Sequence, residues 1–516
     1  MGAGLVMVSA CSSPTPEVST TKSSVSQLFT LEPTQDRKAL QRTAQGYLAT
    51  LLADPANQEV TLVKLDPAVV NDKTRDLAMT LPDGKLAQFH LRDYNTITSG
   101  IDGWVGYKPS EFKAAHPSSV SEIDIDPRYY LSLAREGEKV VGTLLIEGQP
   151  FRIAYVSPGQ HVLIKVDESK LPPDGEPVVD SRAAVKDSTK GKVAASAHSI
   201  IRVLFVTTNQ ARESISAPRL ELANALNNAN QYMKNSQVEI TYELAGFFDA
   251  DYDQTGKKYW EQATDIRSDR AVSAARDALG ADMVNILSTK NELCGQAYLE
   301  SIKATAYSIV SCSTALAHEL GHNIGALHGH HESSPIPEYA YGYRDDVGGF
   351  HTHMNTSHGA IPYFANPNLQ YNRRPLGDAR LHDVARRFNE RRETVENFYP
   401  PYLNQTRVTV YDDVAMKGDS CTFEVPSTQS VVLIDDVCPG GWKARIWSAR
   451  VQGIGANTTL RLGNEVASHT YSSSHYVGDF DVPTLTAVRL DLPDGMTMEP
   501  GSGNLTKRID RLTILR

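Results

Sequence analysis

Three histidines and one glycine at fixed spacing constrain the fold of this chain more than any other feature of its sequence. They lie in the stretch Ala317-His318-Glu319-Leu320-Gly321-His322-Asn323-Ile324-Gly325-Ala326-Leu327-His328. If this stretch is helical, His318 and His322 project from one face at a separation that a single zinc ion bridges. Gly325 can take a left-handed conformation that ends the helix, so that the chain turns and His328 supplies a third nitrogen. The spacing therefore predicts a helix that carries a three-histidine zinc site.

The ligand set of this zinc site is typical of catalysis. Three protein ligands leave a fourth position open for water, whereas structural zinc sites are closed. Glu319 directly follows His318, so it can take a proton from the activated water and pass it to a leaving amine. The alternative is a helix with solvated histidines. The short His-Glu-x-x-His pattern alone arises by chance in about one in fifty chains of this length, and the glycine and third histidine make it roughly several hundred times rarer. We also expect Ser313 or Thr314 to cap the helix.

The full pattern resembles the zinc signature of the metzincin metallopeptidases, and the surrounding sequence resembles bacterial reprolysin-like enzymes over residues 198–400. The resemblance implies a zinc endopeptidase with one catalytic Zn²⁺ held by His318, His322 and His328, with Glu319 as general base. It also implies a methionine turn under the metal, and Met354 lies 26 residues after His328. Residues 361–367 and 381–398 are similar to the wall segment and closing helix of these enzymes.

Two positions depart from the reprolysin-like pattern. Gly329 follows the third histidine, where an aspartate is usual, and Thr356 stands two residues after the turn methionine, where a tyrosine is frequent. Neither change removes a ligand or the base, so the departures bear on the subfamily and not on activity.

Histidines are concentrated around this site. Eight of the 15 histidines fall between residues 318 and 358, and five of them lie outside the signature: His330, His331, His351, His353 and His358. One interpretation is a second metal site. We favour the other, an exposed polar rim, because no carboxylate–histidine spacing repeats in this region.

The rest of the chain divides into units with different patterns. Strand-like and helix-like segments alternate from residue 200 to 287, which favours an α/β (α+β) catalytic domain over residues 198–401. Residues 30–178 carry short β-branched runs and turn signals, typical of a mostly β domain. Residues 402–516 have the pattern of an all-β domain, and residues 179–197 that of a polar linker. A length of 516 residues with 41% hydrophobic residues accommodates three such cores.

The flanking domains carry weaker resemblances. Residues 30–178 resemble the propeptides of bacterial reprolysin-like peptidases, which implies a zymogen. This unit has no cysteine, so inhibition would use a carboxylate or steric cover and not a thiolate, and we expect cleavage between residues 178 and 197. The C-terminal domain has two related halves similar to βγ-crystallin Greek-key motifs. This domain either contacts a glycan or the matrix, or it only stabilises the protein. The rival function for the whole chain is a surface adhesin in which this β domain binds and the metzincin domain is incidental.

The cysteines indicate a compartment. We expect the pairs Cys294–Cys312 and Cys421–Cys438 to form disulfides in an oxidising environment, with four buried free thiols as the alternative. Residues 304–311, between the first pair, resemble the edge strand along which metzincins bind an extended peptide. The fifth, Cys11, follows Val8-Ser9-Ala10 as in a bacterial lipoprotein signal, and the alternative is an ordinary N-terminus.

Charge and hydropathy limit the partners. The formal net charge of −10 gives no basic surplus for nucleic acid, and no apolar run reaches the roughly 20 residues that span a bilayer. Residues 1–29 therefore read as a lipoprotein-type signal and flexible tether, and membrane contact is expected only through a lipid on Cys11. We expect a protein or peptide substrate, and a location in the bacterial cell envelope, as an outer-membrane lipoprotein, or outside the cell.

Overall fold

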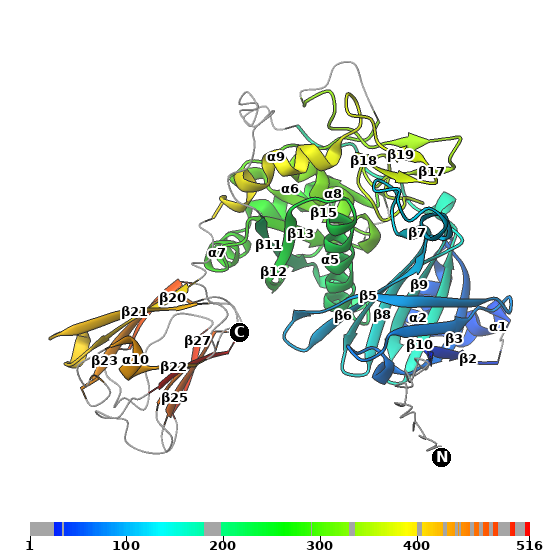
Figure 1. Ribbon diagram of the computed structural model, residues 1–516. Coiled ribbons are helices and arrows are strands. Elements are labelled where there is room, and N and C mark those ends of the chain that lie inside the picture. Colours follow the sequence, from blue (N-terminus) through cyan, green and yellow to red (C-terminus); the bar gives the residue numbers. More distant parts are fainter. Residues whose placement is uncertain are drawn as a thin grey trace, which may run out of the picture.

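The computed structural model describes most of the chain as three units that follow one another in sequence (Figure 1). The described residues are 25–33, 36–179, 198–289, 292–329, 336–399, 405–426, 431–438, 442, 445–454, 459–463, 468–473, 478–482, 496–500 and 511–515. Cys11, the linker from residue 180 onward, and His330 and His331 lie outside these residues. None of the described helices is long and apolar enough to cross a membrane.

The N-terminal unit is built on a ten-stranded sheet in the order β1-β4-β5-β6-β7-β8-β9-β10-β3-β2. Neighbouring strands are antiparallel except for β1 and β4. The strands are β1 (Ser26–Gln27), β2 (Phe29–Leu31), β3 (Asn57–Leu65), β4 (Asp76–Thr80), β5 (Leu86–Thr98), β6 (Ile101–Pro109), β7 (Ile125–Glu136), β8 (Lys139–Ile146), β9 (Gln149–Ser157) and β10 (Gln160–Val166). The helices are α1 (Arg37–Thr43), α2 (Gly46–Ala53) and α3 (Glu111–Ala115), and the 3-10 turn η2 (Glu168–Lys170) follows β10. A mostly β unit was expected here, and the sheet agrees with that expectation.

The central unit has a five-stranded sheet in the order β12-β11-β13-β15-β14. All neighbours are parallel except β14, which is antiparallel to β15. The strands are β11 (Ser199–Thr207), β12 (Ile240–Asp249), β13 (Met283–Leu287), β14 (Gly295–Ala297) and β15 (Tyr307–Val310). The helices are α4 (Asn209–Ser214), α5 (Pro218–Asn235), α6 (Tyr259–Ser268), α7 (Arg270–Ala278), α8 (Leu316–Ile324) and α9 (Val384–Glu396). Every residue of β13 and β15 is buried, as in parallel sheets covered on both faces, and the expected α/β character is confirmed.

One local expectation in this unit was wrong. Residues 304–311 do not form the edge strand, because β15 is paired on both sides, with β13 and with β14. The edge is β14, whose three residues Gly-Gln-Ala are too few to give a recognisable strand pattern. Helix α7 starts after a break at Asp269, whose side chain accepts hydrogen bonds from the amides of Ala271 and Val272.

Helix α8 begins differently from the sequence expectation and ends as expected. Ser313 and Thr314 are not its caps: they lie in a 3-10 turn (Ser313–Ala315) that leads into the helix, whose N-cap Ala315 offers no side-chain acceptor. At the other end Gly325 has a φ of 116°, and its amide bonds the carbonyl of Gly321. The left-handed residue that turns the chain toward His328 is therefore present.

Helix α5 lies between the two sheets and contacts both of them (Figure 1). Its apolar residues, such as Leu222 and Leu226, belong to the core of the central unit. The face toward the N-terminal sheet combines buried amides with an apolar cluster that joins the start of α5 to β6, β7, β8 and β9. Asn224 and Asn228 exchange hydrogen bonds with hydroxyl groups of β7 and β8, including that of Tyr130. The contact between the two units therefore combines apolar packing with buried hydrogen bonds.

Further small elements complete the central unit around helix α8. They are the strand pairs β16 (Arg344–Asp345) with β17 (Phe350–His351) and β18 (Asn366–Tyr371) with β19 (Arg374–Leu376). The predicted closing helix is α9, and it packs on α8 and β11.

The described C-terminal residues form two antiparallel sheets, in the orders β21-β20-β23-β26 and β22-β28-β24-β25-β27. The elements are β20 (Gln405–Tyr411), β21 (Ser420–Pro426), β22 (Val431–Leu433), α10 (Ile434–Val437), β23 (Ser448–Ile454), β24 (Thr459–Gly463), β25 (Ser468–Ser473), β26 (Gly478–Val482), β27 (Met496–Pro500) and β28 (Arg511–Leu515). Their likeness to βγ-crystallin domains remains a prediction. Both expected disulfides, Cys294–Cys312 and Cys421–Cys438, are formed, so the free-thiol alternative was wrong.

A buried ion pair should contribute strongly to the stability of the central unit. Arg202 on β11 donates from Nε and Nη2 to the two carboxylate oxygens of Asp282, at 3.0 Å each, and both side chains are at most 3% exposed. We expect Asp282→Ala to lower the free energy of unfolding by about 3–5 kcal/mol, because it leaves the guanidinium buried without its counter-charge. Denaturant unfolding monitored by circular dichroism measures this loss.

A surface pair provides the control. Asp346 binds Arg344 with side chains 80% and 58% exposed, so Asp346→Ala should cost less than about 1 kcal/mol. Equal losses for the two variants would contradict the assignment of Arg202–Asp282 as a stabilising contact.

Candidate metal centre

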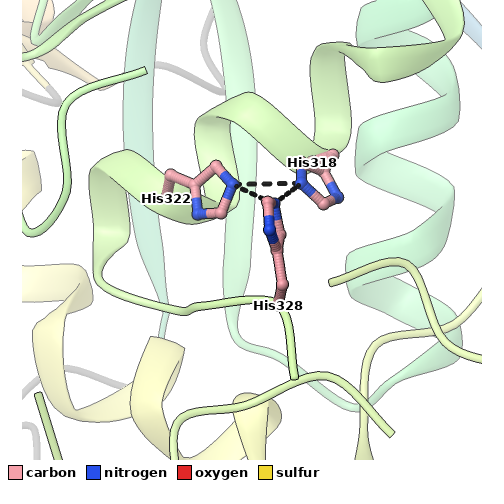
Figure 2. Close-up of side chains that lie close together, drawn as sticks. All are labelled: His318, His322 and His328. Carbon is pink, nitrogen blue, oxygen red and sulfur yellow. Dashed lines mark hydrogen bonds between the residues drawn. The ribbon is translucent and has the colours of Figure 1, made fainter. Parts of the chain in front are cut away.

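The three signature histidines converge on one point (Figure 2). His318 and His322 come from successive turns of α8, and His328 comes from the segment after Gly325. The distances between their Nε2 atoms are 2.8 Å for His318–His328 and 3.0 Å for the other two pairs. Three imidazole nitrogens this close together could hold one metal ion. Zn–N bonds of about 2.0–2.1 Å fit such a triangle with little movement. The donor set therefore suits zinc.

Hydrogen bonds set the tautomers of two ligands. The Nδ1 atom of His318 lies 2.7 Å from the carbonyl oxygen of His353, and that of His322 lies 2.7 Å from the carbonyl oxygen of Ala326. A carbonyl oxygen only accepts, so both Nδ1 atoms carry the proton and both Nε2 lone pairs face the centre. Burial lowers the pKa of His322 well below its usual range and, with repulsion from His318, lowers that of His328 to about 4. His322 and His328 are thus neutral, as metal binding requires.

Glu319 lies beside the histidines and has no partner among the described residues. Its side chain is fully buried, and neither carboxylate oxygen makes a hydrogen bond. Gly295 of β14 makes room for it, since a Cβ at that position would overlap the Glu319 carboxylate. Burial, and then the negative charge of Asp174, raise the pKa of Glu319 well above its usual range. A buried, unpartnered carboxylate next to three metal ligands is placed to exchange protons with a small molecule such as water.

Met354 lies under the metal-binding helix. Its side chain is completely buried, and a Cβ at Gly321 of α8 would contact its sulfur. The preceding residue of the same turn, His353, supplies the carbonyl that accepts from His318. The segment therefore both fills the space beneath α8 and orients one ligand.

The remaining described histidines do not gather into a second metal cluster. His353 is buried and its ring stacks on Tyr232 at 4.5 Å, while His351 bonds the carbonyl oxygen of His358. Among the described residues, the groups that could hold a metal all include His318. The expected exposed rim was also wrong for His353, because Tyr232 of α5 covers it.

The structure adds a residue that sequence reasoning missed. Asp174 follows η2 of the N-terminal unit, and a carboxylate oxygen of Asp174 lies within 4.8 Å of the ligand atoms of His318 and Glu319. It accepts hydrogen bonds from the amide and hydroxyl of Ser357, at 2.7 and 2.6 Å, and from the hydroxyl of Thr356, at 2.7 Å.

The carboxylate of Asp174 is ionised. Burial alone would raise its pKa, but attraction to His318 and the donors of Ser357 outweigh burial and hold the pKa well below its usual range. In the sequence, an aspartate between two prolines and a glycine reads as an ordinary turn, so no local signal identifies it.

Comparison with known proteins agrees with this geometry. Residues 220–329 match the model of the metallo-peptidase family M12B, reprolysin-like. A peptidyl-Asp metalloendopeptidase of Xanthomonas campestris pv. campestris is 28% identical over 67% of this chain and 87% of its own length. One from Stenotrophomonas maltophilia strain K279a is 29% identical over 68% of this chain and 89% of its own length.

The crystal structure of metalloproteinase-II from Bacteroides fragilis aligns with this chain at a TM-score of 0.35 and 10% identity, over 56% of this chain and 86% of that one. The matched family model, the relatives and the converging histidines together support a metalloendopeptidase whose residues 220–329 resemble the reprolysin-like family.

Proposed function

We propose that this protein is a zinc-dependent endopeptidase in which His318, His322 and His328 hold one Zn²⁺ and Glu319 is the general base. The observation that carries the proposal is the convergence of three Nε2 atoms beside a buried carboxylate without a partner. When bound, zinc supplies a Lewis acid that polarises a peptide carbonyl and lowers the pKa of water. The supporting turn at Met354 keeps the floor of the site apolar and free of competing donors.

Glu319 performs the proton transfers. Its buried carboxylate oxygens have no hydrogen-bond partner among the described residues, so they are available to take a proton from the attacking water. The same group, now protonated, can donate to the nitrogen of the leaving amine when the peptide bond breaks. Gly295 brings the edge of the sheet, and hence an extended peptide paired with β14, next to this carboxylate.

Glu319→Gln should abolish turnover without removing the metal. The amide keeps the shape of the side chain but cannot accept the proton, so we expect casein cleavage to fall by about 10²–10⁴-fold. Activity is measured on the full chain after proteolytic cleavage within residues 180–197, and zinc content by atomic absorption. Glu213→Gln, on the exposed face of α4, is the matched control and should leave both unchanged. Retained cleavage by the Glu319 variant would refute the assigned role.

We further propose a preference for peptide bonds next to aspartate. The two relatives described above are named peptidyl-Asp metalloendopeptidases. In this chain, Thr356 and Ser357 direct three hydrogen-bond donors at a carboxylate beside the metal ligands. Once Asp174 is removed, these donors are left in a partly buried place and favour an acidic side chain of the substrate. Thr356 stands where related enzymes often have tyrosine, so the departure would serve specificity.

A peptide series tests this preference. Replacing aspartate by asparagine next to the scissile bond should lower kcat/KM by about tenfold or more, because hydrogen bonds to a charged group contribute roughly 1.5–3 kcal/mol. Ser357→Ala should reduce the ratio between the two peptides, whereas Ser268→Ala, on the exposed end of α6, should not. Equal cleavage of both peptides by the unsubstituted enzyme would rule out the preference.

We propose that the protein works in the bacterial cell envelope or outside the cell. The two disulfides support this, since such bonds persist in oxidising compartments. Lipidation of Cys11 would anchor it to the outer membrane, and the C-terminal sheets would then contact glycan or matrix. Labelling with radioactive palmitate in a bacterial host tests the anchor.

A further inference from the structure

The chain that leaves the N-terminal unit runs along the open edge of the catalytic sheet. After η2, residues 173–178 pair with β14 as an additional strand. The carbonyl of Pro173 accepts from the amide of Cys294, and the amide of Gly175 donates to the carbonyl of Gly295, both at 2.9 Å. The amide of Val178 donates to the carbonyl of Ala297 at 2.8 Å. A substrate strand would need the same edge groups of β14.

Asp174 lies in the middle of this added strand and projects toward the histidines. The peptide groups on either side of it are used by β14, so the carbonyl of Pro173 is directed at the edge strand and not at the metal site. Instead, the side-chain carboxylate of Asp174 reaches the site. One of its oxygens lies within 4.8 Å of the ligand atoms of His318 and Glu319. Thr356 and Ser357 fix it there with three hydrogen bonds. The group that occupies the site is therefore a side-chain carboxylate and not a peptide bond, so the enzyme cannot cleave it.

A second acidic residue of the same strand contacts another ligand. Glu176 Oε1 lies 3.6 Å from Nδ1 of His328, and the backbone carbonyl of Glu176 accepts from the side chain of Gln296 at 2.8 Å. Residues 173–178 thus approach two of the three histidines, and hydrogen bonds to β14 hold the segment in this position.

We propose that the N-terminal unit holds the peptidase latent through Asp174, whose carboxylate supplies the fourth metal ligand while residues 173–178 occupy the substrate edge of β14. This inference rests on the proposed zinc peptidase function and adds its regulation. The position left open by the three histidines is then closed to water, and Glu319 has no molecule to deprotonate.

The contact between the units combines apolar packing with hydrogen bonds. Leu220 and Ala223 of α5 belong to an apolar cluster with residues of β6 to β9. Beside it, Asn224 and Asn228 bond hydroxyl groups of the N-terminal sheet, which water can replace when that unit leaves. Cleavage between residues 178 and 197 would make the blocking strand a separate chain and end its high effective concentration.

Cobalt substitution tests the ligand directly, without relying on activity. The full chain carrying Glu319→Gln, which cannot cleave itself, is loaded with Co²⁺ and its visible absorption spectrum recorded. Adding Asp174→Asn should change the position and intensity of the bands, because a carboxylate ligand is lost. Asp174→Ala should give the same change, which shows that the spectrum reports the ligand and not the hydrogen bonds to Ser357. Glu136→Gln, an exposed residue at the end of β7, is the matched control and should leave the spectrum unaltered.

Activity of the uncleaved chain gives the second measurement. With Glu319 intact, Asp174→Asn should raise peptide cleavage by the full chain at least about tenfold before any cut in the linker. Identical cobalt spectra for chains with and without Asp174 would overturn the proposal. So would equal activity of uncleaved and cleaved chains. If the spectra differ but no chain ever cleaves a peptide, the ligand stands and the proposed peptidase function fails.

Discussion

The left-handed turn at Gly325 is the constraint on which the metal centre depends. Helix α8 alone positions two imidazoles, and the third arrives only because the chain reverses within three residues. The turn is held from outside by α9, where Arg387 Nε donates to the carbonyl of Gly325 and is so close that a Cβ there would lie 3.2 Å from it. A side chain at this position would meet both an unfavourable φ and the arginine. The closing helix is therefore part of the support of the metal site.

Helix α8 is packed on its other faces by residues that fix the positions of its two histidines. Asn323 donates to the carbonyls of Tyr298 and Tyr307, which fixes α8 to the strands beside it. Met354 fills the space at Gly321, where only a glycine allows such an approach. These contacts involve no metal, so the three nitrogens are brought together by the fold itself. Preorganisation of this kind lowers the cost of binding an ion and keeps Glu319 beside it.

Two surfaces join the N-terminal and central units. One is the face of α5, where an apolar cluster lies beside amides that bond hydroxyl groups of the N-terminal sheet. The other is the edge of β14, which pairs with residues 173–178 in this structure and is the natural place for a substrate. Competition for a single edge gives a simple physical basis for latency, because the covering strand and the substrate need the same backbone groups.

The sequence by itself determined the parts of the site that are local. His318, Glu319, His322 and His328 lie within one helix and its turn, so helical geometry and one glycine are enough to predict their convergence. The buried strands β11 and β13 were likewise readable from short apolar runs. The edge β14 was not, because three residues carry no periodicity and their pairing with β15 depends on the sheet.

Only the tertiary structure decided what lies around those residues. Asp174 is far from the signature in sequence and reaches it through the path of the chain along β14, which no local pattern encodes. The same is true of Thr356 and Ser357, whose donors acquire a role only when a carboxylate is brought to them. Ligand spacing is a property of a helix, whereas the groups that close or open the site come from separate elements and depend on how those elements pack.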